Sequence, residues 1–303
     1  MQNTVSWHVL LESYPVLMGF KMLQLLLTNT MLGIILAVIT SLLWNIAPII
    51  QKEALSEMEE IDAKNPMKHT RALFAKPRWV IGFLMALVGG LTYLFATQLA
   101  GIVVIQPLMN IGLIALVYLS SKRLGEKIDM PAMLGIVLLI FTPVFIALGG
   151  VTEPVMFTDY TGILLYSVAM FVGIGTLAGG TRKVAILWAP ITAFVQALAS
   201  QFTQWFTLAL FGEADILQGF INSLLPLILL GIFTAIAAIY TVSIGLQRNL
   251  ASRFNAITGT ISMFAVILGG IIIFGQVISD MLFYGVGLAF GLIGVVLLSK
   301  YQD

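Results

Sequence analysis

Polar side chains recur at helical spacing inside strongly apolar stretches of this sequence. Residues three and four apart share one face of a helix, and the apolar stretch 184–211 shows this spacing in Thr192, Gln196, Ser200, Thr203, Gln204 and Thr207. An amide without a partner is costly in an apolar environment. This face is therefore expected to meet water or a polar solute, which it would bind through amide and hydroxyl groups.

Similar groups in other apolar stretches are candidates to line the same path. For an isolated Ser or Thr the alternative is a hydrogen bond between helices, which contributes about 0.6 kcal/mol on average. The full set of predicted path-lining residues is Asn45, Tyr93, Gln106, Asn110, Gln196, Ser200, Gln204, Tyr240, Asn255 and Thr258.

The apolar stretches contain no Asp or Glu well inside them, the two histidines, His8 and His69, lie outside them, and cysteine is absent. Intramembrane proteolysis and prenyl transfer need acidic or nucleophilic groups that are missing here, so we expect no enzyme and no cofactor.

Proton coupling usually uses a buried carboxylate or histidine; we therefore expect exchange, facilitated diffusion or potential-driven movement. Mg²⁺ prefers oxygen ligands and keeps its water, so its binding should be weak, and a neutral or zwitterionic metabolite would suit an amide-lined cavity equally.

The elements that position these groups are apolar runs of membrane-spanning length. The mean hydropathy is +1.03, and 59% of the residues are hydrophobic while 10% are charged. About 20 apolar residues span a bilayer as a helix. The runs are approximately 31–50, 79–99, 102–121, 131–150, 158–178, 184–211, 219–244, 254–275 and 281–299.

The basic residues predict how these runs are oriented. Fourteen of the fifteen Lys and Arg residues fall in alternate gaps between the runs, and only Lys21 does not. Because basic short loops stay in the cytoplasm, we expect an all-α integral membrane protein of the plasma or inner membrane with a cytoplasmic C-terminus. The formal net charge of +1 gives no indication of a nucleic-acid partner.

Residues 1–30 allow two interpretations. The stretch from Val9 to Leu27 is apolar but contains Glu12, Pro15 and Lys21. It could form an interfacial helix on the outer side, or a further crossing that would raise the number of transmembrane helices from nine to ten. The first is favoured, since a Glu inside the bilayer is costly without a partner.

The two halves of the chain show weak similarity at an offset of 150 residues, with Gly125 matching Gly275 and Glu126 matching Gln276. The matched segments have opposite predicted orientations, which is typical of the inverted-topology repeats of secondary transporters. We predict a first repeat over 31–150, with a cytoplasmic loop at 52–78 that could hold a short helix, and a second repeat over 151–303. The cavity should lie between crossings one, three, six and eight. A GxxxG step at Gly287 and Gly291 leaves both monomer and homodimer open.

Three segments resemble a known family: Ile49–Leu55, Ala96–Ile128 and Ile244–Gln276. They are similar to segments of the drug/metabolite transporter superfamily, whose fold is EamA-like, and most similar to the NIPA-type magnesium transporters. The resemblance implies a transporter or facilitator that moves Mg²⁺ or another divalent cation across the bilayer by alternating access. A small organic metabolite or drug, as in the broader superfamily, is the alternative substrate.

Overall fold

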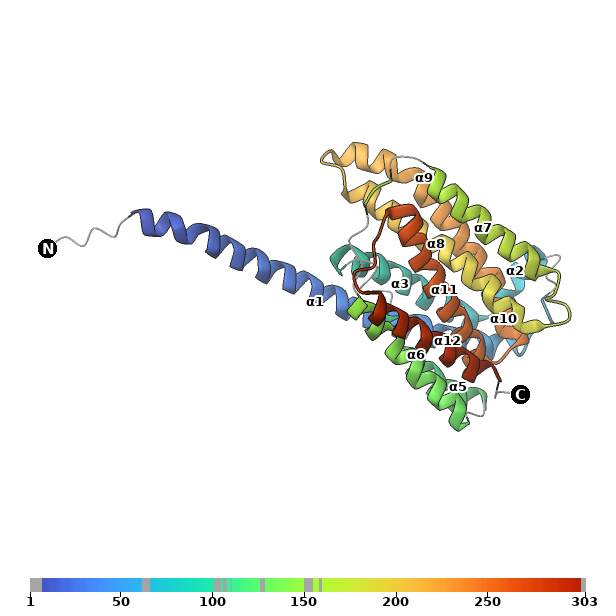
Figure 1. Ribbon diagram of the computed structural model, residues 1–303. Coiled ribbons are helices and arrows are strands. Elements are labelled where there is room, and N and C mark those ends of the chain that lie inside the picture. Colours follow the sequence, from blue (N-terminus) through green and yellow to red (C-terminus); the bar gives the residue numbers. More distant parts are fainter. Residues whose placement is uncertain are drawn as a thin grey trace.

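The computed structural model describes the backbone of residues 7–61, 66–100, 105, 108–109, 111–125, 129–149, 155–157 and 160–300, and, within these ranges, most side chains from residue 31 onward. The regular elements in these residues are all helices (Figure 1). They are α1 (Trp7–Leu55), α2 (Pro66–Phe74), α3 (Pro77–Ala100), α5 (Leu113–Leu124), α6 (Met130–Gly149), α7 (Thr161–Ala178), the 3₁₀-helix η1 (Ala185–Leu187), α8 (Trp188–Phe211), α9 (Ile216–Ala235), the π-helix η2 (Ile236–Thr241), α10 (Val242–Arg248), α11 (Ala251–Phe274) and α12 (Met281–Lys300).

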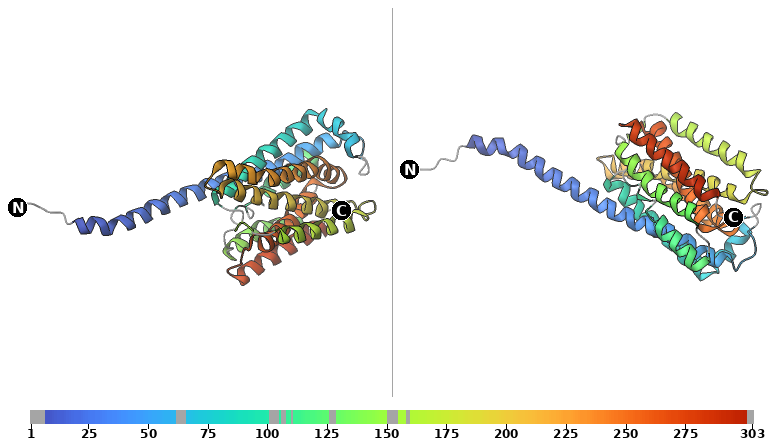
Figure 2. Two further views of the ribbon diagram at one scale, coloured as in Figure 1. Left: turned by 90° about the horizontal axis from the view of Figure 1, so that it is seen from above. Right: turned by 60° about the horizontal axis from the view of Figure 1, so that its bottom comes forward.

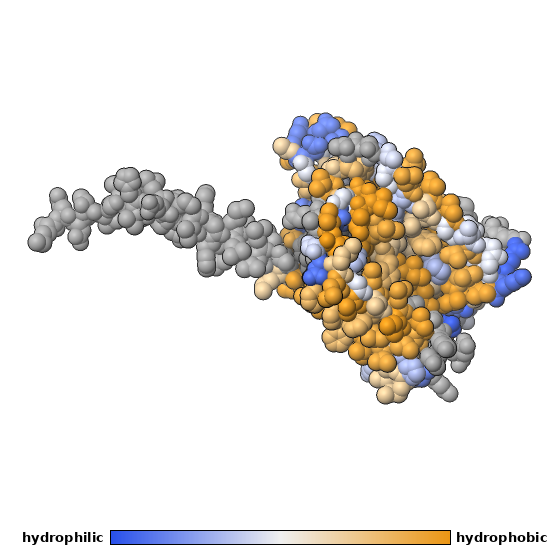
Figure 3. All heavy atoms as spheres, in the orientation of Figure 1, coloured by the Kyte–Doolittle hydropathy of each residue, from blue (hydrophilic) through white to orange (hydrophobic). Residues whose placement is uncertain are grey.

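Among the described residues, six helices are long and apolar enough to cross a membrane. Two shorter apolar stretches, Met130–Thr142 and Met281–Gly294, lie within α6 and α12. Large apolar side chains such as Leu164, Phe171 and Ile228 are more than half exposed, and hydrophobic residues cover most of the face in Figure 3. Because so much exposed apolar surface requires lipid, the prediction of an all-α, multi-pass membrane protein is confirmed.

The first helix is longer than any single crossing requires. Its 49 residues run without interruption from Trp7 to Leu55, a length of about 73 Å at 1.5 Å per residue. The hydrocarbon core of a bilayer is only about 30 Å thick. Residues 7–30 therefore continue the helix of the first predicted crossing, and Figures 1 and 2 show this part extending away from the bundle.

The basic loops gather at one end of the bundle. The side chain of Lys52 donates a hydrogen bond to the carbonyl oxygen of Asn249, and Asn249 Nδ2 donates to the Ala185 carbonyl oxygen at 3.2 Å. These contacts join three of the loops that the charge pattern places on the same side. Helix α2 lies within the polar segment 52–78, as the sequence allowed.

The two halves end their third and eighth crossings in the same way. Gly125 follows α5 with φ 67° and ψ 18°, and Gly275 follows α11 with φ 63° and ψ 23°. Each amide bonds to the carbonyl five residues earlier, of Ser120 and Gly270 respectively. This left-handed conformation strongly favours glycine, so the glycine pair found at the 150-residue offset has a shared structural role, which supports the repeat.

The expectation of one continuous helix over 102–121 is wrong. Residue Met109 and residues Ile111 and Gly112 form turns, and α5 begins only at Leu113. The counterpart in the second half, α11, is unbroken over 24 residues. The two matched segments therefore differ in structure, and the reason lies in side chains of α1 described below.

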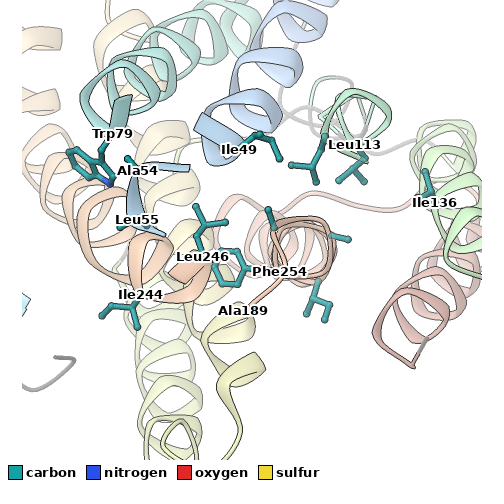
Figure 4. Close-up of a cluster of buried hydrophobic side chains, with 14 of the residues drawn as sticks. Ile49, Ala54, Leu55, Trp79, Leu113, Ile136, Ala189, Ile244, Leu246 and Phe254 are labelled. Carbon is teal, nitrogen blue, oxygen red and sulfur yellow. The ribbon is translucent and has the colours of Figure 1, made fainter. Parts of the chain in front are cut away.

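A buried apolar cluster holds the helices together near the basic end (Figure 4). Leu55 from α1, Trp79 from α3, Leu246 from α10 and Phe254 from α11 are almost completely buried in it. The cluster thus joins helices from both halves of the chain.

Candidate functional site

The break before α5 is clamped by two polar side chains of α1. Ser41 Oγ donates to the carbonyl oxygen of Met109 at 2.7 Å and accepts from the Gly112 amide at 2.7 Å. Asn45 Nδ2 donates to the same Met109 oxygen at 3.2 Å and to the Ser41 carbonyl oxygen at 2.8 Å. The start of a helix has amide groups without intrahelical partners, and Ser41 satisfies the one on Gly112.

Gly112 permits this close contact between α5 and α1. A Cβ atom at Gly112 would lie 2.2 Å from the Ser41 carbonyl oxygen and 2.5 Å from Asn45 Nδ2. The backbone angles of Gly112 are ordinary for any residue. Glycine is therefore required at this position because it has no side chain, and not because of an unusual φ. The result is an interrupted crossing with polar backbone atoms inside the apolar layer, an arrangement that lines binding sites in many transporters.

Aromatic side chains of α1 and α3 connect α1 with α8. Trp44 Nε1 donates to the Ala86 carbonyl oxygen at 3.0 Å, and the rings of Trp44 and Tyr93 have centroids 5.0 Å apart. The Ser200 side chain lies beside the buried Tyr93 hydroxyl. Two predicted residues, Tyr93 and Ser200, are therefore neighbours.

Helices α8 and α11 are joined by Gln201, which lies outside the predicted set of path-lining residues. Its Nε2 donates to the Val266 carbonyl oxygen at 2.9 Å, and its side chain fills the space above Gly269. Thr258 Oγ1 donates to the Ala189 carbonyl oxygen at 3.2 Å. Both contacts hold neighbouring helices together, which gives Thr258 a structural role.

The other predicted residues are distributed as follows. Asn255 donates to Ala251 of its own helix at 2.8 Å, Gln196 is half-buried, and Gln204 is buried on α8. Tyr240 lies in the π-helix η2, with its hydroxyl 3.4 Å from Thr70 Oγ1 near the basic end. Gln106 and Asn110 are outside the described residues.

The predicted set of path-lining residues contains neither Ser41 nor Gln201. A lone serine in an apolar run gives little signal, because most such hydroxyls bond to their own helix, as Thr203 and Thr207 do here. The available signal for Ser41 was its spacing of four residues from Asn45, which puts both side chains on one face of α1.

Cation coordination by side chains would rely on neutral oxygens. Among the residues that the structure describes, no group of three or more His, Cys, Asp or Glu residues could hold a metal ion. The polar atoms near the break are carbonyl, hydroxyl and amide groups. Such groups fit a hydrated ion or a neutral polar solute held weakly.

Comparisons with known proteins point in one direction. Residues 28–171, nearly half of the chain, match the model of the family described as magnesium transporter NIPA. A probable magnesium transporter of Arabidopsis thaliana, NIPA9, is 34% identical over 92 residues, which cover 30% of this chain and 26% of that protein. The aligned part of the chain thus spans about a quarter of that relative's length, and no solved structure matches the chain. These matches confirm the resemblance stated from the sequence: the chain is a multi-pass membrane protein that is similar, over nearly half of its length, to the NIPA magnesium transporter family.

Proposed function

We propose that this protein is a membrane transporter or facilitator that moves Mg²⁺ or another divalent cation, with no catalytic step of its own. The observation that carries the proposal is the interrupted crossing at Met109–Gly112, held by Ser41 and Asn45. All of these residues fall within the segment that matches the magnesium transporter family. The proposed path runs past this break and along the polar side of α8.

The chemistry of the break suits a largely hydrated cation. Asn45 uses its Nδ2 group in both hydrogen bonds that hold the break, so we assign its Oδ1 oxygen the role of meeting the solute. Mg²⁺ gives up water reluctantly, and amide and carbonyl oxygens can bind its water shell without stripping it. A site with neutral ligands binds weakly enough to release the ion, which favours transport over storage.

The path has a polar entrance on α8. Trp188 Nε1 and Thr192 Oγ1 are buried four residues apart and have no hydrogen-bond partner among the described residues. Buried polar atoms are normally satisfied, often by water. We propose that water reaches them along the same face of α8 that carries Gln196 and Ser200, and that alternating access exposes this face to each side in turn.

The orientation follows from the charges. The loops around Lys52, Arg123, Arg182 and Arg248 carry most of the basic residues, and such loops stay in the cytoplasm. We therefore propose that the basic end, together with the C-terminus, is cytoplasmic in the plasma or inner membrane.

A small organic metabolite is the second candidate solute. The contact between the rings of Trp44 and Tyr93 beside Ser200 favours it, because an aromatic surface next to a hydroxyl suits an organic molecule better than an ion.

Reconstitution in liposomes distinguishes a divalent cation from an organic metabolite as the solute. Purified protein in liposomes should give saturable Mg²⁺ influx, read by a dye inside the vesicles, and Gln196→Ala should reduce it. Empty vesicles provide the background. Folded protein that gives no influx above this background would reject the cation proposal and direct the same vesicles to metabolite uptake screens.

A further inference from the structure

A pocket of about 480 Å³ opens at the basic end of the bundle, away from the interrupted crossing. It lies where the end of α1, the loop after α7 and the end of α10 meet, and its polar lining includes Ser56, Glu60, Thr181, Arg182, Gln247 and Arg248. Its volume is within the range of pockets that bind small ligands. The proposed transport path does not use any of these residues.

Two arginines and one carboxylate set the charge of the pocket. Arg248 Nε lies 2.8 Å from Glu60 Oε1, but its N–H is not aligned for a hydrogen bond with this oxygen. The Arg248 side chain is 21% exposed, whereas that of Glu60 is 68% exposed. Within the described part of the chain, no carboxylate pairs with Arg182. The pocket therefore has a net positive charge, and Glu60 is free to move away into solvent.

The wall of the pocket is held independently of that ion pair. Gln247 Oε1 accepts from the Ile61 amide at 2.8 Å, and Gln247 Nε2 donates to the Glu59 carbonyl oxygen at 2.9 Å. Arg248 Nη2 donates to the Ile61 carbonyl oxygen at 3.3 Å. The segment 55–61 is thus fixed to α10 through backbone atoms, so the pocket keeps its shape if Glu60 gives up Arg248 to another anion.

We propose that this pocket binds a phosphate-bearing anion, held by Arg182 and Arg248 and in competition with Glu60. Guanidinium groups bind phosphate through two parallel hydrogen bonds. Basic pockets between helices at the cytoplasmic face bind anionic lipid headgroups, and a soluble phosphate compound offers the same chemistry. When the ligand is absent, Glu60 forms an ion pair with Arg248. An ion pair with so exposed a partner contributes little to stability. The ligand can therefore displace it.

The test measures binding to the full-length protein purified in detergent, by native mass spectrometry. Three probes are used: inorganic phosphate, dioctanoyl phosphatidic acid, and dioctanoyl phosphatidylcholine as the control lipid. Preference for phosphatidic acid over both other probes identifies a lipid site, and equal binding of inorganic phosphate identifies a soluble ligand. Binding of all three probes at the same strength, or of none, overturns the proposal.

Substitutions in and beside the pocket test whether the probe binds at this site and whether Glu60 competes with it. Arg248→Gln should weaken binding about tenfold, as expected for loss of a charge-assisted hydrogen bond, and Arg182→Gln should weaken it less because Arg182 is exposed. Lys183→Gln removes the same charge from the neighbouring residue, which does not line the pocket, and should leave binding unchanged. Glu60→Gln removes the competitor and should tighten binding severalfold. Equal losses in all three basic variants, or no gain in Glu60→Gln, would contradict the proposal, and this gain cannot result from misfolding.

Discussion

Ser41 Oγ lies 2.7 Å from the Met109 carbonyl oxygen and 2.7 Å from the Gly112 amide nitrogen, so a single hydroxyl of α1 bridges both sides of the break before α5. The break persists because these backbone atoms, which an unbroken helix would pair internally, are satisfied by a neighbouring helix. Backbone groups inside a bilayer need such partners. The first crossing therefore determines the shape of the third.

Replacing this hydroxyl should loosen the break. Ser41→Ala leaves the Gly112 amide without its partner and leaves the Met109 carbonyl with only the bond from Asn45 Nδ2. We expect this to lower the free energy of unfolding by about 1–3 kcal/mol. Thermal unfolding in detergent measures the change. Ser223→Ala is the matched control, since the Ser223 hydroxyl is buried and bonds to Phe220 in its own helix; an equal loss in both variants would mean that the bridge has no special role.

The close approach of α5 to α1 should not tolerate a methyl group. Gly112→Ala places a Cβ atom 2.2 Å from a backbone oxygen, which only a shift of one helix can relieve. We expect a marked loss of stability and of transport, measured as unfolding temperature and vesicle flux. Gly90→Ala has open space around its Cβ and should be neutral or stabilising by up to about 1 kcal/mol, the difference in helix propensity. Equal behaviour of the two variants would argue against the contact.

Much of this fold can be predicted from the sequence, because lipid imposes strong rules on composition. The apolar runs and alternating basic gaps predict the helices and the polar 52–78 segment with its short helix, and the 150-residue offset finds the two glycines that end α5 and α11. These features depend on the residues of each segment alone, so the pattern of apolar, basic and glycine residues predicts them.

The break before α5 cannot be predicted in the same way. Residues 102–121 are predominantly apolar, and the interruption depends on a serine and an asparagine about 70 residues away. Gln201 was left out of the predicted set for the same reason, because its role depends on a hydrogen bond to the Val266 carbonyl oxygen on another helix. Tertiary contacts of this kind leave no periodic signal in a single sequence.

The segment 55–61 should depend on one glutamine. Gln247→Ala removes the acceptor for the Ile61 amide and the donor for the Glu59 carbonyl. We expect amide exchange of residues 56–61 to quicken at least tenfold, since each lost hydrogen bond lowers protection by about 1 kcal/mol or more. Hydrogen–deuterium exchange with mass spectrometry measures it.

The control for that variant is Gln218→Ala, because Gln218 is exposed and bonds to Asn222 on its own helix, at 3.0 Å. It should leave exchange in residues 56–61 unchanged. Unaltered exchange in Gln247→Ala would show that the segment is held by the buried side chain of Ile61 instead.

The most direct test of the account is Mg²⁺ influx into liposomes that contain wild-type protein, Asn45→Ala or Asn222→Ala at equal density. Asn45 contacts the break, whereas Asn222 is exposed at the opposite end beside Glu213. The account predicts saturable influx by the wild type, about tenfold less for folded Asn45→Ala, as expected from losing roughly 1.4 kcal/mol of interaction with the ion in transit, and no change for Asn222→Ala. Wild-type influx in Asn45→Ala would contradict it.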